Sequence, residues 1–406
     1  MTRAPEQCVI LIGGLGTRLG ELTAATPKPL LQVGGRPFLE YMLREAARFG
    51  FRRILLLAGW RCEQVEAYLE TSGIGLALGL EINVAVESEP AGTGGALWLA
   101  RDALDEWFYL VNGDSWFDFN WLSLLTVDGA ATATATIALR GTEDPGRYGT
   151  VETAGSLVRR FRERPYAGGP SQVNAGVYLV SRRIVDQLSA PCSLERDGFA
   201  KLADTGQLRA KAYQGRFIDI GVPEDFARAQ HLLPAWRIRP AVFLDRDGTI
   251  NEDTGYVHTV EGFRWLPGAE SAVRRLNDAG YYVFVVTNQA GVARGLYRET
   301  DVTSLHAWLQ AALRAQGAHI DDFRYCPHHP DGVIEAYRRT HDWRKPSPGM
   351  LLDLIEAWPI DIGRSVMIGD QPSDIDAGRA AGVRAMLVGP DGLAGAVSQL
   401  LDPDVR

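Results

Sequence analysis

The chain contains two separate starts of an α/β unit, and this feature most constrains how it can fold. The first start lies at residues 8–20, and the second at 240–251, where the sequence reads PAVFLDRDGTIN. In the second, the apolar run 241–244 leads directly into Asp245, Asp247 and a glycine turn. A buried strand that ends in acidic residues and a glycine turn is how an α/β domain places chemistry at the carboxyl end of its sheet. We therefore expect two complete domains with a site in each.

Length and composition agree with two domains of ordinary size. A chain of 406 residues exceeds what one hydrophobic core usually serves, and its apolar content of 46% is that of a globular protein. We expect an N-terminal domain over residues 1–233, a short proline-containing linker over 234–239 and a C-terminal domain over 240–406. The expected fold class is α/β, with two Rossmann-like three-layer domains.

Charge and cysteine content restrict the partners and the compartment. A net charge of −8 argues against nucleic acid as the main ligand, although a local basic pocket can still hold a phosphorylated small molecule. Four widely spread cysteines favour a reducing cytoplasm over a disulfide framework. The apolar run near the N-terminus is too short for a signal peptide or a membrane span, so no membrane partner is expected. Whether the chain forms oligomers stays open.

A glycine-rich loop follows the first strand. The sequence there is GGLGTR, followed shortly by TPKP. Glycines leave backbone N–H groups open to a pyrophosphate, and a tight strand–helix turn without a ligand is the alternative. The coupled pattern resembles the signature of sugar-phosphate nucleotidyltransferases over roughly residues 8–232. The resemblance implies a GT-A-like domain with Arg18 and Lys28 as catalytic residues. It also implies nucleotide contacts from Gly13, Gly14, Gly16 and Thr17.

Strands and helices alternate after this loop. Residues 53–59 and 80–87 read as strands on either side of a helix at 62–71. This βαβ rhythm predicts a mostly parallel sheet. Further along, the alternating small residues of 131–140 predict a half-buried strand.

The segment 89–96 reads EPAGTGGA, and its glycines would let the backbone approach a flat ligand. In the resembled family this loop borders the nucleobase, which implies contacts from Gly92, Thr93 and Gly94. Glu89 can accept hydrogen bonds from the N1–H and N2–H₂ edge of guanine, which adenine and cytosine do not offer in that form. An ordinary surface acid is the alternative for Glu89.

Two aspartates are the expected metal ligands of the first domain. Asp114 ends the apolar run 107–114, and Asp219 lies in the segment FIDIGVPEDF. A strand-end aspartate beside phosphates is suited to bind Mg²⁺, and a turn-forming residue is the alternative. The family resemblance implies that both carboxylates hold Mg²⁺. It also implies a sugar-phosphate pocket that contains Tyr148, Gly149, Glu163, Asn174, Glu195 and Lys201, although a solvated charge is the alternative for Glu163 and Lys201.

The second start resembles motif I of the haloacid dehalogenase-like (HAD-like) phosphatases. In that family Asp245 would attack phosphorus to form an aspartyl-phosphate, and Asp247 would protonate the leaving alkoxide and then activate water. A bare DxD can also be a loop of Asx turns, but further elements follow in the order that the family requires. They are Thr287 and Asn288 at the end of the apolar run 281–289, the cation Lys345, and Asp370, which with Asp245 and Asp247 would hold Mg²⁺.

The segments between these motifs leave no room for a large cap domain. The runs NQAGVARG and CPHHP resemble the branch of heptose bisphosphate and histidinol-phosphate phosphatases. In that branch Arg294 and Arg344 would be placed to hold the second phosphate of the substrate.

The same branch usually closes a structural zinc site with a C-x-H pair and a later C-x-C pair. Cys326, His328 and His341 supply zinc-ligand types at matching positions, but Trp343 replaces the last cysteine and cannot bind zinc. Bound zinc therefore stays open, with packing and hydrogen bonds as the alternative that holds the loop.

Two resembled activities on one chain imply consecutive steps of nucleotide-sugar synthesis. The C-terminal domain would remove the 7-phosphate of D-glycero-D-manno-heptose 1,7-bisphosphate. The N-terminal domain would couple the heptose 1-phosphate to a nucleotide, expected to come from GTP, and release pyrophosphate. The product would be an NDP-heptose for lipopolysaccharide or another surface glycan. Two alternatives stay open: a hexose 1-phosphate nucleotidyltransferase fused to a phosphatase of other specificity, and one domain that only binds a regulatory ligand.

Overall fold

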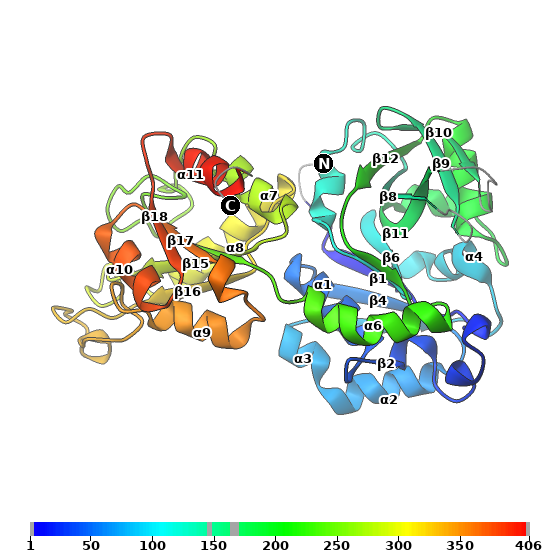
Figure 1. Ribbon diagram of the computed structural model, residues 1–406, viewed down its shortest axis with the longest axis horizontal. Helices are drawn as coiled ribbons and strands as arrows, with labels where there is room; N and C mark the ends of the chain where they lie inside the picture. Colours follow the sequence, from blue (N-terminus) through cyan, green and yellow to red (C-terminus); the bar gives the residue numbers. More distant parts are fainter. Residues whose placement is uncertain (1–3, 144–147, 163–169, 403–406) are drawn as a thin grey trace. The chain divides into compact units, whose positions relative to one another are not determined.

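The computed structural model describes residues 4–143, 148–162 and 170–402, and the chain divides into two compact units. The first unit is Met1–Trp236 and the second is Arg237–Arg406 (Figure 1). Helix α6 (Pro223–Trp236) continues through the first half of the segment expected as a linker. Its last residue, Trp236, stacks on Trp116 with ring centroids 5.7 Å apart, so residues 234–236 belong to the packed part of the first unit.

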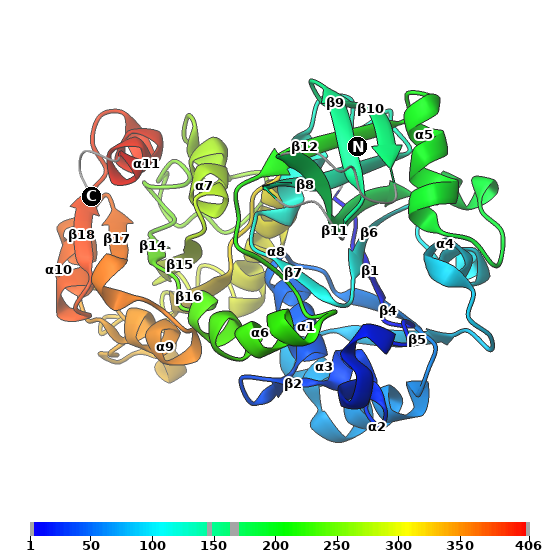
Figure 2. The same cartoon turned by 45° about the vertical axis from the view of Figure 1, so that its right-hand side comes forward.

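The first unit is built on a mixed sheet, which has nine strands among the described residues (Figure 2). Strands β5, β4, β1 and β6 are parallel, and beyond β6 most pairs are antiparallel. The prediction of a mostly parallel sheet is wrong for this second half, because the βαβ rhythm behind it stops at β6. In sheet order the strands are β5 (Glu81–Val86), β4 (Arg53–Ala58), β1 (Gln7–Leu11), β6 (Trp107–Asn112), β11 (Ser171–Ser181), β8 (Ala135–Thr142), β12 (Leu208–Tyr213), β10 (Leu157–Arg162) and β9 (Thr150–Ala154).

Hydrophobic clusters cover both faces of this sheet. In β1, Cys8 and Ile10 pack into one cluster and Val9 packs into the other, as a nearly continuous apolar strand requires. The strand predicted at 131–140 begins only at Ala135 and is buried on both faces rather than half-buried, because a cluster lies on each side of it. One cluster includes residues of helices α1 (Phe38–Arg48), α2 (Cys62–Ser72), α3 (Ile74–Leu78) and α6, and the other includes residues of α4 (Gly92–Leu99) and α5 (Ala200–Asp204).

A small antiparallel ribbon lies outside the main sheet. Its strands are β7 (Ser115–Phe117), which follows β6 closely, and β13 (Phe217–Asp219). The register places Asp219 opposite Ser115, which is the residue after Asp114. The ribbon therefore brings together two aspartates that are far apart in sequence. A second short hairpin joins β2 (Gln32–Val33) to β3 (Arg36–Pro37).

The second unit has a parallel sheet, with five strands in its described part, in the order β16-β15-β14-β17-β18. This is the 3-2-1-4-5 order of a doubly wound fold, whose chain direction reverses beside β14. Ligands bind such sheets at the carboxyl ends of the strands near this reversal. The strands are β14 (Ala241–Leu244), β15 (Tyr282–Asn288), β16 (Asp322–Cys326), β17 (Val366–Gly369) and β18 (Arg384–Leu387).

Helices cover both faces of this second sheet and complete its three layers. One hydrophobic cluster contains residues of α7 (Ala269–Asp278), α8 (Glu299–Ala315) and α11 (Gly392–Leu401). The other contains residues of α9 (Gly349–Ala357) and α10 (Pro372–Ala380). Across the described ranges of both units, no helix combines the length and the apolar character needed to span a membrane.

Candidate active sites

The first unit has a cleft of about 420 Å³ at the carboxyl ends of β1 and β6. Most of the predicted nucleotide-loop residues meet there. The cleft is lined, among others, by Gly13, Gly14, Gly16, Thr17, Lys28, Gly92, Thr93 and Asp114. Gly16 has φ of 64°, and a Cβ there would lie 2.8 Å from the Thr23 Cγ2 atom, so this turn needs glycine. The Thr23 hydroxyl donates to the Gly16 carbonyl at 3.0 Å and fixes the loop.

Two acids and two cations gather around Gly221, and two of these four residues, Lys28 and Asp114, line the cleft. Lys28 Nζ lies 2.7 Å from Asp114 Oδ2, and the Gly221 N–H donates to Asp219 Oδ1 at 2.7 Å. A Cβ on Gly221 would lie 2.8 Å from Asp219 Oδ1, 3.1 Å from Arg18 Nη2 and 3.3 Å from Lys28 Nζ. The structure therefore brings together the four residues that the sequence predicted as metal ligands and catalytic cations.

The two carboxyls of this cluster differ in pKa. Burial and the neighbouring Asp114 charge raise the pKa of Asp219 to about 6. Burial also raises the pKa of Asp114, but the Lys28 ion pair, the Ser115 hydroxyl and Arg18 together outweigh it, so the net shift is downward. Two adjacent hard oxygen donors, one of which resists ionisation because of burial and of its charged neighbour, fit a divalent cation such as Mg²⁺.

A different acid from the predicted one lines the cleft beside β5. Glu89 is exposed and does not line the cleft, whereas Glu87 does. Glu87 Oε2 accepts the Ala91 N–H at 3.2 Å, and burial raises the pKa of Glu87. A Cβ at Gly13 or Gly59 would lie 2.8 or 2.6 Å from Glu87 Oε1, so both glycines make room for this side chain. The acid that lines this part of the cleft is therefore Glu87 and not Glu89.

The predicted sugar-side residues are only partly assembled at this cleft. Glu195 Oε2 accepts the Thr93 hydroxyl at 2.8 Å, and Asn174 Nδ2 donates to Tyr178 Oη at 2.8 Å. Gly94 packs on Cys192 instead of lining the cleft, because a Cβ there would lie 2.7 Å from Cys192 Sγ. Several others do not line the cleft: Tyr148 makes an edge-to-face contact with Phe217 and lies under the Arg140 guanidinium, Gly149 packs on Phe161, and Lys201 is exposed on α5. The predicted Glu163 lies outside the described residues.

The second unit has a cleft of about 410 Å³ at the carboxyl ends of β14, β15 and β17. Asp245 follows β14, Thr287 lies in β15 and Asp370 follows β17, so each strand of the sheet centre contributes one residue. The predicted residues that line the cleft are Asp245, Asp247, Thr287, Asn288, Lys345 and Asp370.

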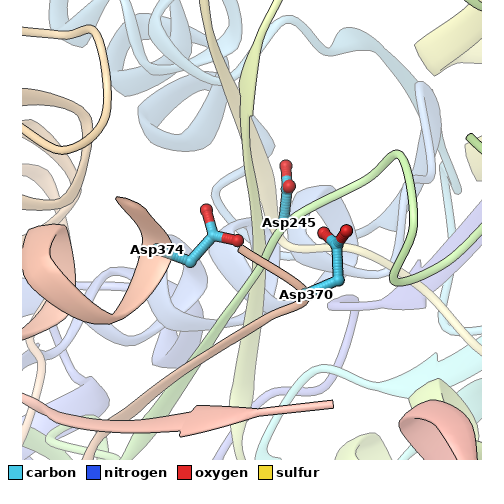
Figure 3. A group of neighbouring side chains, drawn as sticks. All are labelled: Asp245, Asp370 and Asp374. Carbon is cyan, nitrogen blue, oxygen red and sulfur yellow. The ribbon is translucent and has the colours of Figure 1, made fainter. Parts of the chain in front are cut away.

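Asp245, Asp370 and Asp374 form an acidic cluster, which Figure 3 shows. Each offers an oxygen, and these atoms lie within 4.8 Å of one another. Lys345 Nζ lies 2.8 Å from Asp245 Oδ1 and 2.6 Å from Asp374 Oδ1. Burial raises the pKa of Asp245 to about 7, with Lys345 opposing the shift and Asp374 adding to it. Three carboxylates around one lysine leave excess negative charge on hard oxygen donors, which fits Mg²⁺.

Asp247 lies outside this acidic cluster, and its predicted contact with Mg²⁺ stays a prediction. Its carboxylate faces Arg246, Asn251 and Gln289, which all donate hydrogen bonds to it. The third member of the cluster is Asp374, at the start of α10. The acid/base role predicted for Asp247 is compatible with this position, because the side chain still lines the cleft.

Three other predicted residues have identifiable surroundings. Asn288 exchanges two hydrogen bonds of 3.1 Å with the Lys345 backbone, so it positions the lysine as well as lining the cleft. Arg294 is exposed and Arg344 is half-buried, and neither lines the cleft. Burial and then the nearby Arg294 charge lower the pKa of Arg344, so the two guanidinium groups lie in the same electrostatic neighbourhood.

Cys326, His328 and His341 do not converge on a metal position. The His328 and His341 rings stack with centroids 4.4 Å apart and planes 14° apart, so their nitrogens lie in nearly parallel planes. The Arg339 guanidinium lies 3.1 Å from His328 Nε2, where a metal would approach, and Trp343 N–H donates to His341 Nδ1. Since arginine can only donate, His328 Nε2 is the acceptor. The residues present do not fit zinc, and the stack and Arg339 hold the loop instead.

Comparisons with known proteins agree with the geometry of both units. The family model described as nucleotidyl transferase matches residues 7–235, and the HAD-hydrolase-like model matches residues 342–394. A D-glycero-beta-D-manno-heptose-1,7-bisphosphate 7-phosphatase from Rhodopseudomonas palustris is 57% identical over 145 residues, which are 36% of this chain and 81% of the relative. The protein of that name from Escherichia coli K12 is 45% identical over 144 residues, which are 36% of this chain and 75% of the relative.

Among solved structures, HddC from Yersinia pseudotuberculosis is similar to this chain with a TM-score of 0.50 and 28% identity. The similarity covers 56% of this chain and 100% of HddC. The chain therefore belongs to the nucleotidyl transferase family and also carries a HAD-like hydrolase domain related to these phosphatases.

Proposed function

We propose that this protein is a bifunctional enzyme that makes an NDP-heptose in two consecutive steps. The second unit removes the 7-phosphate of D-glycero-D-manno-heptose 1,7-bisphosphate, and the first unit joins the resulting heptose 1-phosphate to a nucleotide. The observation that carries this proposal is the presence of two separate clefts, each with its own buried aspartates and a partnered lysine. The identity of the sugar in this proposal comes from the similarity to the heptose bisphosphate phosphatases.

In the phosphatase step, the Asp245 carboxylate attacks phosphorus and the bond from phosphorus to the sugar oxygen breaks. Asp247 gives its proton to the leaving alkoxide and then takes one from the water that hydrolyses the aspartyl-phosphate. Lys345, held by Asn288, balances charge beside the nucleophile, and the Thr287 hydroxyl is available to the phosphate. Mg²⁺ held by Asp245, Asp370 and Asp374 would offset the repulsion between carboxylate and phosphate.

In the transfer step, an oxygen of the sugar 1-phosphate attacks the α-phosphorus of the nucleoside triphosphate, and pyrophosphate leaves in line with it. Arg18 and Lys28 stabilise the charge that develops on the phosphates, and the cleft aligns the reactants. Mg²⁺ held by Asp114 and Asp219 would add to that charge stabilisation.

We propose GTP as the nucleotide donor, with Glu87 reading the base. A buried carboxylate accepts two hydrogen bonds from the N1–H and N2–H₂ edge of guanine, and an unpaired buried carboxylate is costly when another base is bound. Glu87 lines the cleft, and its raised pKa reflects partial removal from water. We place the reactions in the cytoplasm, since Cys8, Cys62, Cys192 and Cys326 are all unpaired.

The deciding experiment supplies the protein with heptose 1,7-bisphosphate, Mg²⁺ and each of the four nucleoside triphosphates in turn. Phosphate release in every reaction, with pyrophosphate and a nucleotide-heptose only with GTP, is the expected result. Parallel reactions with mannose 1-phosphate and glucose 1-phosphate test the sugar. Faster pyrophosphate release with a hexose 1-phosphate than with the heptose substrate would refute the heptose assignment. Release of neither phosphate nor pyrophosphate would refute the proposed bifunctional activity.

A further inference from the structure

The Asp247 carboxylate accepts hydrogen bonds from three neighbouring side chains. Asp247 Oδ1 accepts from Arg246 Nε at 3.1 Å and from Asn251 Nδ2 at 2.9 Å. Asp247 Oδ2 accepts from Arg246 Nη2 at 2.8 Å and from Gln289 Nε2 at 3.0 Å. Arg246 is fully buried and also donates to the Val257 carbonyl at 2.5 Å, so it is fixed independently of Asp247. The rotation of the carboxylate is therefore set by its neighbours.

Gln289 connects this carboxylate to the phosphate side of the cleft. Its Nε2 donates to Asp247 Oδ2 and also to Thr287 Oγ1, at 2.9 Å. Because the Thr287 oxygen accepts this bond, its own proton is free to point elsewhere, and Thr287 lines the cleft. Gln289 is only 2% exposed, so water does not replace these bonds easily.

Tyr297 fixes which way the Gln289 amide faces. Tyr297 Oη donates to Gln289 Oε1 at 2.7 Å, and burial raises the pKa of Tyr297 to about 12, so the phenol keeps its proton. A flipped amide would turn its oxygen toward the Asp247 carboxylate and its N–H₂ group toward the phenol. The hydroxyl therefore selects the orientation that serves Asp247 and Thr287 together.

The position of Tyr297 is itself determined by packing. Its ring stacks on His258 with centroids 4.6 Å apart and planes 12° apart. A Cβ at Gly291 would overlap the Tyr297 ring, so the loop between β15 and α8 has glycine where the ring passes. The phenol lies 7% exposed and lines the same cleft as Asp247.

We propose that Tyr297 and Gln289 are positioning residues of the phosphatase. Through the Gln289 side-chain amide they orient Asp247, which donates a proton to the leaving group, and Thr287, whose hydroxyl donates a hydrogen bond to the phosphate. This inference rests on the proposed phosphatase function. Neither side chain exchanges a proton in the reaction. Their effect is to keep Asp247 aimed at the leaving oxygen and the Thr287 proton aimed at the phosphate.

The leaving group distinguishes this role from a merely structural one. An alkoxide needs a proton as it departs, whereas p-nitrophenolate is stable without one. The kcat/KM value reports the step in which the leaving group departs. Tyr297→Phe should therefore lower kcat/KM about tenfold for heptose 1,7-bisphosphate and less than about threefold for p-nitrophenyl phosphate. Equal losses on both esters would overturn the proposal.

A double-mutant cycle tests whether the tyrosine acts through the glutamine. Gln289→Leu should cause a larger selective loss than Tyr297→Phe, and the double variant should be no slower than Gln289→Leu alone. Multiplying losses would show that Tyr297 acts by another route and would overturn the relay. Tyr281→Phe is the matched control, because Tyr281 is a buried tyrosine at the amino end of β15, away from the cleft, and it should keep wild-type rates.

Two further measurements separate misfolding and failure of the proposed function from failure of this inference. Nucleotide transfer from heptose 1-phosphate shows whether the first unit of each variant is folded and active. Circular dichroism and thermal unfolding show whether the second unit of each variant is as folded and as stable as that of the wild type. If the wild-type protein releases phosphate from neither ester, the proposed phosphatase fails and this inference fails with it. If the wild-type protein is active and the variants lose both esters equally, only this inference fails.

Discussion

The Lys345 ammonium lies 2.8 Å from the Asp245 carboxylate, and both groups are buried at the carboxyl end of the sheet. Burial alone lowers the pKa of Lys345, but the charges of Asp245 and then Asp374 more than reverse this, so the lysine stays protonated. The ion pair places a permanent cation beside the proposed nucleophile. In the proposed phosphatase reaction this cation would also balance the charge of the incoming phosphate.

Replacement of the proposed nucleophile should separate the two activities. Asp245→Asn keeps the size of the side chain but removes the attacking oxygen anion, so phosphate release should fall by at least about 1000-fold. Nucleotide transfer from heptose 1-phosphate should stay within twofold of the wild-type rate. Both rates are measured by coupled assays for phosphate and pyrophosphate. The control is Asp376→Asn on the exposed side of α10, and loss of both activities in Asp245→Asn would contradict the assignment.

The raised pKa of Asp219 predicts a pH-dependent cost in the metal-free first unit. A carboxyl whose pKa is about 6 when folded and near its usual value when unfolded destabilises the fold once it is ionised. Stability from this group should therefore rise as pH falls from about 7 to 4. Asp219→Asn should stabilise the metal-free protein at pH 7.5 by about 1–3 kcal/mol and flatten this slope, while abolishing transfer. Thermal unfolding of the wild-type and Asp219→Asn proteins at pH 7.5 and pH 5, both in EDTA, measures this difference. The same pH dependence of stability in both proteins would contradict the raised pKa of Asp219.

Glu87 and Glu89 provide a matched pair for testing base recognition. Glu87→Gln replaces an acceptor oxygen with an N–H₂ donor, which cannot accept from guanine, so kcat/KM for GTP should fall about 10- to 100-fold. Glu89 does not line the cleft, so Glu89→Gln should change kcat/KM for GTP less than twofold. The four nucleoside triphosphates are compared with both variants. A larger effect at Glu89 would restore the sequence-based assignment.

The loop between β16 and α9 should hold without zinc. Purified protein should contain less than about 0.1 zinc per chain, and a strong zinc chelator should leave its unfolding temperature unchanged. Arg339→Ala removes the cation next to His328 and should lower the free energy of unfolding of the second unit by about 1 kcal/mol. Metal analysis and thermal unfolding give both values. Stoichiometric zinc, or a chelator effect larger than that of Arg339→Ala, would refute the metal-free loop.

The aspartates of both clefts could be predicted from the sequence because they lie at strand ends, where an apolar run stops. Asp114, Asp245 and Asp370 were identified in this way, and the structure brings each to a cleft. Glu87 was missed because the sequence predicts a strand over residues 80–87, so Glu89 was the first acid of the expected loop. The choice follows from where β5 ends, at Val86, and from the turn that comes next.

Other features depend on packing that no local pattern encodes. Spacing identified Cys326, His328 and His341 as zinc-ligand types, but ring orientation is set by neighbours, and Arg339 could not be foreseen beside His328. Likewise Asp247 matches the motif, yet the donor shell around it is contributed partly by Gln289 from another strand end. The prediction of a mostly parallel sheet is wrong beyond β6, because the strands that pair there, such as β6 with β11 and β11 with β8, are far apart in sequence and their direction is set by tertiary contacts.

The ribbon of β7 and β13 has a consequence for how the enzyme comes into being during synthesis. Asp114 leaves the ribosome long before Asp219, and the strands β8 to β12 emerge between them. Until β13 pairs with β7, the acidic pair of the first unit is incomplete. A nascent chain that has built most of its sheet therefore still lacks the pair of carboxylates that we propose for Mg²⁺, and this pair forms only when the last strand of that unit is in place.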